Sequence, residues 1–269
     1  MKPMSCKLWI IPIISSLLLL TLLSCGNEET KSPTSEKENG LIGEGESSLQ
    51  ESYVATDRDK VTAKHMALYL SGENLPPKDL CEKILNNLIT IRSAFGSEIE
   101  QIESIHFWMY WEPGEIGLQF IEEINVDEYD AWDVLNETYG VTNIRRSGDS
   151  GVILYFSEAY HPSFLQEQYK ELPNLQMIFP SLSGGDSPNI YPRMVGDTIT
   201  YLFRNAWGDC PAGCTNSEYW YIRIDNGEPV MVGYWNPSDD PNEPDWWQEA
   251  KLNRDNFRKY PMPETLYLN

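Results

Sequence analysis

The order of strand and helix patterns between residues 105 and 180 constrains the fold more than any other feature of the sequence. Short apolar runs predict strands at 105–111, 116–121, 141–146, 152–156 and 175–179. Between them, apolar residues at helical spacing predict one helix that starts at Asn125 and another that Pro162 opens. Glu112-Pro113-Gly114 predicts a turn between the first two strands. The chain is therefore expected to be an α+β protein.

From residue 115 to 180 the expected order is β-α-β-β-α-β, the split arrangement of ferredoxin-like modules, and residues 105–182 are assigned to one such module. The stretches PGEIGLQF, LNETYGV, GVILYF and YKELPNLQMIFPS within it resemble the propeptide and inhibitor module of subtilisin-type proteases. The catalytic motifs that follow a propeptide in that family are absent, so the resemblance implies a freestanding module. It also implies that the end of the last strand enters a protease active-site cleft, and that segment is Phe179, Pro180, Ser181, Leu182 and Ser183.

Residues 183–269 have a different pattern, which predicts an antiparallel β-meander followed by a closing helix. Strands are expected at 198–207, 219–224 and 230–234, and Asp225-Asn226-Gly227 is a strong hairpin signal between the last two. Trp246, Trp247, Leu252 and Phe257 predict a helix in the tail that packs on the meander.

Residues 52–104 are expected to form an N-terminal helical segment. Pro77 and Gly96 bracket a run of apolar residues at helical spacing, which predicts a helix over 77–95. Cys81 lies on the apolar face of that helix, where an inert core thiol is expected; a disulfide partner or a reactive thiol is the alternative.

The N-terminus has the pattern of a secretory signal. Lys2 and Lys7 flank the start of an apolar run that is shorter than the roughly 20 residues of a membrane span. It ends in Leu22-Leu23-Ser24-Cys25, which resembles the lipobox of bacterial lipoproteins. The resemblance implies a signal peptide at 1–24, acylation of Cys25 and lipid anchoring in the bacterial cell envelope. Gly26, rather than the aspartate that retains such proteins in the inner membrane, favours the outer membrane. An uncleaved anchor is the alternative.

The segment 25–51 is expected to be a flexible acidic tether, because it contains no aromatic residue and is dominated by Glu, Ser, Gly and Lys. The whole chain has a net charge of −21, and removal of the two lysines in 1–24 would make it −23. Nucleic acid is excluded as a partner because its binding requires a basic surface. The expected partners are the membrane, through the lipid at Cys25, and a protein such as a protease or another envelope protein.

Cys210 and Cys214 are the sharpest local feature of the sequence. In an oxidising compartment, two cysteines this close predict a disulfide, with redox catalysis and metal binding as alternatives. The phrase WGDCPAGC that contains them resembles a motif of secreted bacterial proteins whose function is uncharacterised. Aromatic side chains near this loop are candidates for a patch that binds a protein or a glycan, namely Trp207, Tyr219 and Trp220.

No pattern typical of an enzyme site is present. The sequence contains no Gly-x-Ser-x-Gly, no glycine-rich phosphate loop and no His-Glu-x-x-His, and no cofactor or metal is expected. His106 is expected to be structural and His161 to cap a helix. The acidic tail cluster is expected to be a solvated face, with weak calcium binding as the alternative: Asp239, Asp240, Glu243 and Asp245. We expect a noncatalytic binding module; the alternative is an envelope enzyme such as a thiol oxidoreductase that uses Cys210 and Cys214.

Overall fold

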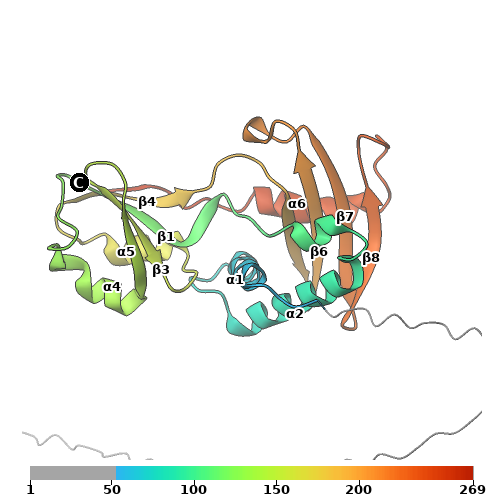
Figure 1. The fold of residues 1–269 in the computed structure, drawn as a ribbon, viewed down its shortest axis with the longest axis horizontal. Helices are drawn as coiled ribbons and strands as arrows, with labels where there is room; N and C mark the ends of the chain where they lie inside the picture. The colour runs from blue at the N-terminus through green and yellow to red at the C-terminus, as the bar shows by residue number, and fades with distance from the viewer. Residues whose placement is uncertain (1–52, 269) are drawn as a thin grey trace, which may run out of the picture. The chain divides into compact units, whose positions relative to one another are not determined.

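The computed structural model describes residues 53–268, which form an α+β fold (Figure 1). Two antiparallel sheets, of five and four strands, and six α-helices make up these residues. The expected signal peptide at 1–24, the lipidation site Cys25 and the tether at 25–51 lie outside them. Within the described residues, no helix has both the length and the hydropathy that crossing a membrane requires.

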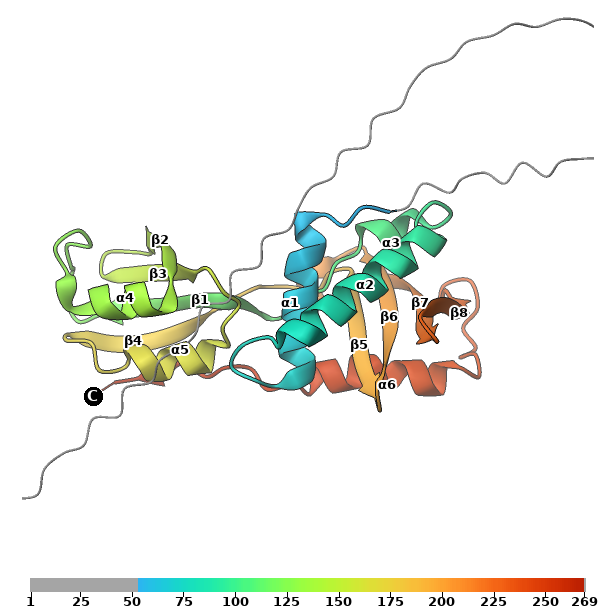
Figure 2. The same cartoon turned by 90° about the horizontal axis from the view of Figure 1, so that it is seen from below.

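The first sheet has the strand order β2-β3-β1-β4-β9, and every neighbouring pair is antiparallel. Its strands are β1 (Trp111–Phe120), β2 (Val141–Arg146), β3 (Gly151–Phe156), β4 (Leu175–Leu182) and β9 (Leu266–Tyr267). Helices α4 (Asp133–Tyr139) and α5 (Pro162–Tyr169) lie on the same side of this sheet (Figure 2). The strands predicted at 141–146 and 152–156 are confirmed, and the last predicted strand continues to Leu182.

Side chains at alternate strand positions pack the sheet against its helices, because successive side chains of a strand point to opposite faces. Ile116 and Leu118 of β1, Leu154 of β3 and Ile178 of β4 are fully buried, and they pack in one core with Tyr169 of α5. Burial of each such aliphatic side chain contributes about 1.5–3 kcal/mol, so this face cannot be exposed without unfolding the sheet.

The predicted turn at Glu112-Pro113-Gly114 is wrong, and so is the separate strand at 105–111. Strand β1 begins at Trp111 and continues through Glu112, Pro113 and Gly114, which form a bulge: Trp111 pairs with Leu182 and Ile116 with Pro180. Gly114 has a φ of 72°, which a glycine adopts without strain, and proline is tolerated at a bulge.

The loop 105–110 that precedes β1 is extended but is not part of a sheet. The side chain of Asn189 takes the place of a neighbouring strand, because it accepts from Trp108 N at 2.9 Å and donates to Trp108 O at 2.9 Å. An amide side chain thus satisfies the backbone groups that a strand would otherwise pair.

The helix predicted to begin at Asn125 instead begins at Asp133, after a 3₁₀ turn over Asp130–Trp132. Asn125 does not form the expected capping box with Glu128. Its Oδ1 accepts from Asp127 N at 3.3 Å and its carbonyl accepts from Glu128 N at 3.1 Å. These local bonds make a turn that competes with helix formation, as short polar side chains often do.

The second sheet has the order β5-β6-β7-β8 and consists of β5 (Asn189–Val195), β6 (Thr198–Trp207), β7 (Asn216–Asp225) and β8 (Glu228–Trp235). The predicted meander and its hairpin are confirmed: Asp225 pairs with Glu228, and both Asn226 and Gly227 have positive φ, as the tight turn requires. Strand β5 was not predicted, since Pro192 interrupts its pattern; the proline is accommodated because β5 is an edge strand.

Helices cover both faces of the second sheet (Figure 2). They are α1 (Asp57–Ser71), α2 (Lys78–Phe95) and α3 (Glu100–Ser104), with α6 (Trp247–Arg258) on the opposite face. The central strand β6 is therefore buried on both sides. Tyr201 accepts from Asn87 of α2 at 2.8 Å, whereas Asn253 of α6 donates to Thr200 O at 3.1 Å. The predicted helices over 77–95 and in the tail are confirmed, and Cys81 is a half-buried free thiol.

Candidate functional site

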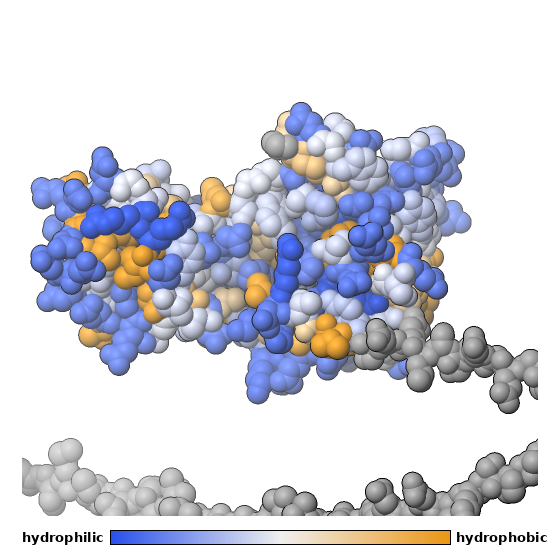
Figure 3. All heavy atoms as spheres, in the orientation of Figure 1, coloured by the Kyte–Doolittle hydropathy of each residue, from blue (hydrophilic) through white to orange (hydrophobic). Residues whose placement is uncertain are grey.

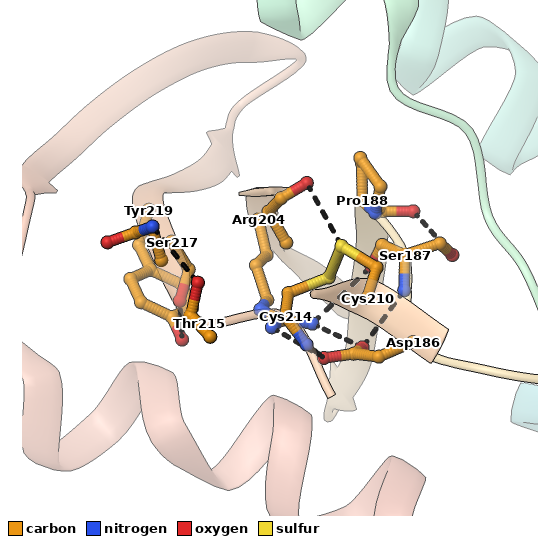
Figure 4. The surroundings of a disulfide bond; sticks show 11 residues. Asp186, Ser187, Pro188, Arg204, Cys210, Cys214, Thr215, Ser217 and Tyr219 are labelled. Carbon is orange, nitrogen blue, oxygen red and sulfur yellow. Dashed lines mark hydrogen bonds and ion pairs between the residues drawn. A yellow bond between two sulfur atoms is a disulfide. The ribbon is translucent and has the colours of Figure 1, made fainter. Parts of the chain in front are cut away.

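Cys210 and Cys214 lie in the loop between β6 and β7 and are joined by a disulfide, as the sequence predicts (Figure 4). The loop is tied to the segment before β5 by Asp186. The backbone N–H of Asp186 donates to Cys210 O at 2.9 Å, and Asp186 Oδ2 accepts from Cys214 N at 3.2 Å. Two segments about 25 residues apart in the sequence are therefore held together at the disulfide.

Asp186 is itself held by Arg204 of β6. The guanidinium donates through Nη1 at 2.6 Å and Nη2 at 2.8 Å, which makes a bidentate ion pair, and the Arg204 side chain is only 5% exposed. Partial burial would raise the pKa of the Asp186 carboxyl, but the hydrogen bonds and charge of Arg204 outweigh it, and the pKa is lowered. The carboxylate therefore stays ionised and compensates a buried positive charge.

This environment does not resemble that of a catalytic thiol. Reactive cysteines are activated by helix N-termini or by positive charge. Here the charge of Arg204 is compensated by Asp186, whose carboxylate accepts from Cys214 N, and the helical residues of the loop are only the short 3₁₀ turn Cys210–Ala212. In the part of the chain that the structure describes, no three His, Cys, Asp or Glu side chains come close enough to hold a metal ion. We therefore find no feature of the loop that favours the redox or the metal alternative.

The predicted aromatic patch near the loop is only partly exposed. Trp207 is 41% exposed at the end of β6. Tyr219 and Trp220 are each 4% exposed, and Tyr219 stacks on Trp235 with ring centroids 5.8 Å apart. The expectation that these two rings are available to a partner is wrong, because their strand β7 lies between covered faces and both side chains belong to the core.

The segment 179–183 is the end of β4 and the residue after it, not a free tail. Pro180 is buried, Phe179 and Ser181 are half-buried, and Leu182 is 61% exposed. Ser183 is tied to the start of β1, since its N–H donates to Tyr110 O at 3.0 Å and its hydroxyl donates to the Glu112 carboxylate. The segment is thus presented as a rigid strand end.

We call the face of the first sheet that points away from α4 and α5 the open face. The strand register shows which residues lie side by side on this face: Arg145 pairs with Ile153, Ile153 with Gly117 and Gly117 with Phe179. The Phe179 ring lies directly over Gly117, where a Cβ would come within 2.1 Å of it. Its exposed or half-buried side chains are Arg145, Tyr155, Met177, Phe179 and Tyr267 together with Glu115, Gln119, Asn143 and Ser181, and Ile153 is buried beneath them.

Elsewhere the visible surface is mostly hydrophilic, with small apolar patches among charged side chains (Figure 3). This agrees with a chain whose net charge is −21. On the open face, three aromatic rings, one methionine and one arginine lie together among the polar side chains of Glu115, Gln119 and Asn143.

A cleft of about 490 Å³ lies between α1 and the loop 105–110. The polar residues that line it include Arg58, Thr62 and His65 of α1, His106 of the loop and Glu112 of β1. No sequence motif indicated this site, because its residues come from distant segments. His65, His106 and Glu112 would be a plausible set of metal ligands, but they do not lie close enough together to form one.

Behind His106 lies a buried ion pair between Asp59 of α1 and Arg92 of α2, and neither side chain is exposed. Asp59 also caps its own helix with Thr56, and Tyr53 donates to its Oδ2 at 2.8 Å. Arg92 Nη2 donates to Ile105 O at 2.7 Å. This network fixes the start of the loop 105–110 and hence the position of His106.

Both imidazoles of the cleft are held neutral. Burial lowers the pKa of His65 to about 4, helped by the charge of Lys64. Burial also lowers the pKa of His106 to about 4; the bond to Ser104 opposes this shift, while Arg92 and Arg58 reinforce it. His106 Nδ1 lies 2.7 Å from Ser104 O, so we assign the proton to that nitrogen. His161, as predicted, caps α5, since its Nδ1 accepts from Ser163 N at 3.2 Å.

Comparison of the chain with protein-family models, with curated proteins and with solved structures finds no match. Function must therefore be inferred from the surfaces described above: the disulfide loop, the open face and the cleft.

Proposed function

We propose that residues 111–182 form a ferredoxin-like module. The strand order β2-β3-β1-β4 supports this assignment, because in the split β-α-β arrangement the third strand inserts between the first and the second. The antiparallel pairing of all four strands and the position of α4 and α5 on one side are as that arrangement requires.

We further propose that the chain is a noncatalytic protein-binding module, anchored by lipid at Cys25 to a membrane of the bacterial cell envelope. The observation that carries the binding function is the open face. Aromatic residues, Met and Arg are enriched at protein interfaces, and the face presents Tyr155, Met177, Phe179 and Arg145 on one rigid sheet. A disulfide in the same chain agrees with an exported protein, since such bonds persist in oxidising compartments.

The partner we propose is a serine protease of the subtilisin type. The resemblance of 115–180 to the inhibitor modules of such proteases supports this choice. So does the strand end at Phe179–Ser183, because Leu182 is exposed while Pro180 and Ser183 hold the backbone in place. A preorganised strand loses little entropy on binding, which favours affinity.

The test is inhibition of a purified subtilisin-type protease by the protein, with three variants compared. Phe179→Asp and Leu182→Asp alter the proposed contact, whereas Met194→Asp places the same charge on β5 of the other sheet, where the side chain is 41% exposed. We expect inhibition at micromolar concentration that the first two variants lose and the third keeps.

Circular dichroism and thermal unfolding must show that all three variants are folded. Inhibition that survives both Phe179→Asp and Leu182→Asp would contradict the proposed surface. Cleavage of the folded protein by the protease without any inhibition would contradict the proposed partner.

A further inference from the structure

The cleft between α1 and the loop 105–110 has the size and lining of a small-molecule site. Its volume of about 490 Å³ lies within the range of ligand pockets. A neighbouring hollow of about 460 Å³ shares Arg58, Ser104 and His106 with it. The cleft is separate from the open face, so a ligand held there is independent of the proposed protein-binding function.

The lining of the cleft is mixed. It includes the apolar residues Val61, Phe107, Trp108, Met109 and Pro188. It also includes the polar or charged residues Arg58, Thr62, His65 and His106. This combination suits a ligand that has an apolar body and a polar head.

Positively charged side chains lie at the cleft, although the whole chain is strongly acidic. Arg58 is exposed at the mouth and forms no ion pair within residues 53–268. The cationic groups that act on the two imidazoles are Lys64, Arg92 and Arg58, and the Asp59 carboxylate lies 3.8 Å from His106 Nε2. The nearby Asp59 carboxylate is compensated by Arg92.

Three further carboxylates face this region. Glu112 lines the cleft, but it accepts the Ser183 hydroxyl. Glu100 and Glu103 line only the neighbouring hollow. The Arg58 guanidinium therefore remains the one cationic group at the mouth of the cleft, within residues 53–268, that has no partner in the protein.

From this juxtaposition we propose that the cleft binds an organic carboxylate with an aromatic or aliphatic body. The Arg58 guanidinium pairs with the carboxylate in the bidentate geometry that the two planar groups share. The body of the ligand lies against the half-buried ring of Trp108. His65, which makes no hydrogen bond to another described residue, also lines the cleft and is available to donate to the ligand.

The experiment is a titration of the purified protein with 4-phenylbutyrate and with its neutral isostere 4-phenylbutanamide, followed by calorimetry and by NMR of the Trp108 indole. The Trp108 signal is assigned by its loss in Trp108→Phe. We expect saturable binding of the carboxylate, a shift of the Trp108 signal and much weaker binding of the amide.

Arg58→Gln should weaken carboxylate binding about tenfold or more, because a charge-assisted pair is lost. Arg258→Gln, an exposed arginine at the end of α6, is the matched control and should bind as the parent does. Equal affinity for acid and amide, unchanged affinity in Arg58→Gln, or no saturable binding of the carboxylate would each overturn the proposal. The protease assay with Phe179→Asp is unaffected by any of these results.

Discussion

Single residues fix the geometry of this protein where the chain lacks regular structure. Asp186 anchors the disulfide loop through Arg204, and Asp59 anchors the loop 105–110 through Arg92. In both places a buried cation is compensated by a carboxylate that also accepts backbone N–H groups. Buried pairs of this kind contribute little net stability but cost much when one partner is removed.

Asp186→Asn should therefore destabilise the protein by about 2–3 kcal/mol, because it leaves the Arg204 guanidinium buried without its counter-charge. The value is set below the full cost of a buried pair because Asp186 is 30% exposed. Denaturant unfolding measures the change. The matched control is Asp225→Asn in the exposed pair with Arg223, which should have little effect. Equal effects of the two substitutions would contradict the role given to Asp186.

Stability should fall as the pH drops from about 6.5 to about 4, because the unfolded imidazoles bind protons that the folded ones cannot. The sign follows from the depressed pKa of His65 and His106 in the fold. His65 alone should account for up to about 3 kcal/mol of this loss.

Urea unfolding of the parent and of His65→Gln across this pH range measures that contribution. The carboxylates titrate alike in both proteins, so the difference between the two curves isolates His65. Parallel curves would show that His65 is not buried as a neutral ring.

At the scale of elements, the sequence predicts strands and helices correctly where interactions between residues close together in the chain determine them. The hairpin at Asn226-Gly227 and the helix that Pro162 opens are set by turn and capping chemistry within a few residues. The predictions failed where distant groups decide. Residues 105–110 of the predicted strand are instead a loop, in which the Asn189 side chain bonds the backbone of Trp108, and the predicted turn at Pro113-Gly114 is a bulge where β1 pairs with β4.

The candidate sites also differ in whether nearby or distant residues determine them, and only the former could be predicted. The disulfide could be predicted because its cysteines are four residues apart. The burial of Tyr219 and Trp220 could not, since it depends on which faces of the meander are covered. The cleft could not be predicted either, because Arg58, His65 and His106 come together only through the packing of α1 against the loop 105–110.

Within the first sheet, Gly117 of β1 should tolerate no side chain. A Cβ there would come within 2.1 Å of the Phe179 ring, so Gly117→Ala should destabilise the protein by about 1–3 kcal/mol. Addition of Phe179→Leu should restore part of that loss, which a double-mutant cycle measures by denaturant unfolding. Gly184→Ala is the control, because nothing lies within 4 Å of its Cβ position. Strictly additive effects at Gly117 and Phe179 would contradict the contact.

Residues 53–268 contain two hydrophobic cores, one for each sheet, and the N-terminal sequence before them resembles a lipoprotein signal. In the proposed arrangement the lipid holds the protein at a membrane, while the open face and the cleft remain available to a protein and to a small anion respectively. The strong negative charge of the chain would keep the folded part away from anionic lipid.

Cys25→Ser should abolish attachment of lipid and release the protein from the membrane fraction, because the acyl chains are the proposed anchor. Expression in a bacterial host with labelled palmitate, followed by fractionation and mass spectrometry, tests this. Cys81→Ser is the matched control and should leave both labelling and fractionation unchanged. Membrane retention of Cys25→Ser would indicate an uncleaved anchor in place of the lipid.

The central claim is that the open face binds a protein, and the most direct measurement is a comparative pull-down from bacterial envelope extract with quantitative mass spectrometry. The parent, Phe179→Asp and Met194→Asp are used as baits in parallel. We predict a protein that the parent and Met194→Asp retain and that Phe179→Asp loses, with a subtilisin-type protease as the expected identity. Retention of the same proteins by all three baits would contradict the claim that this face is the binding surface.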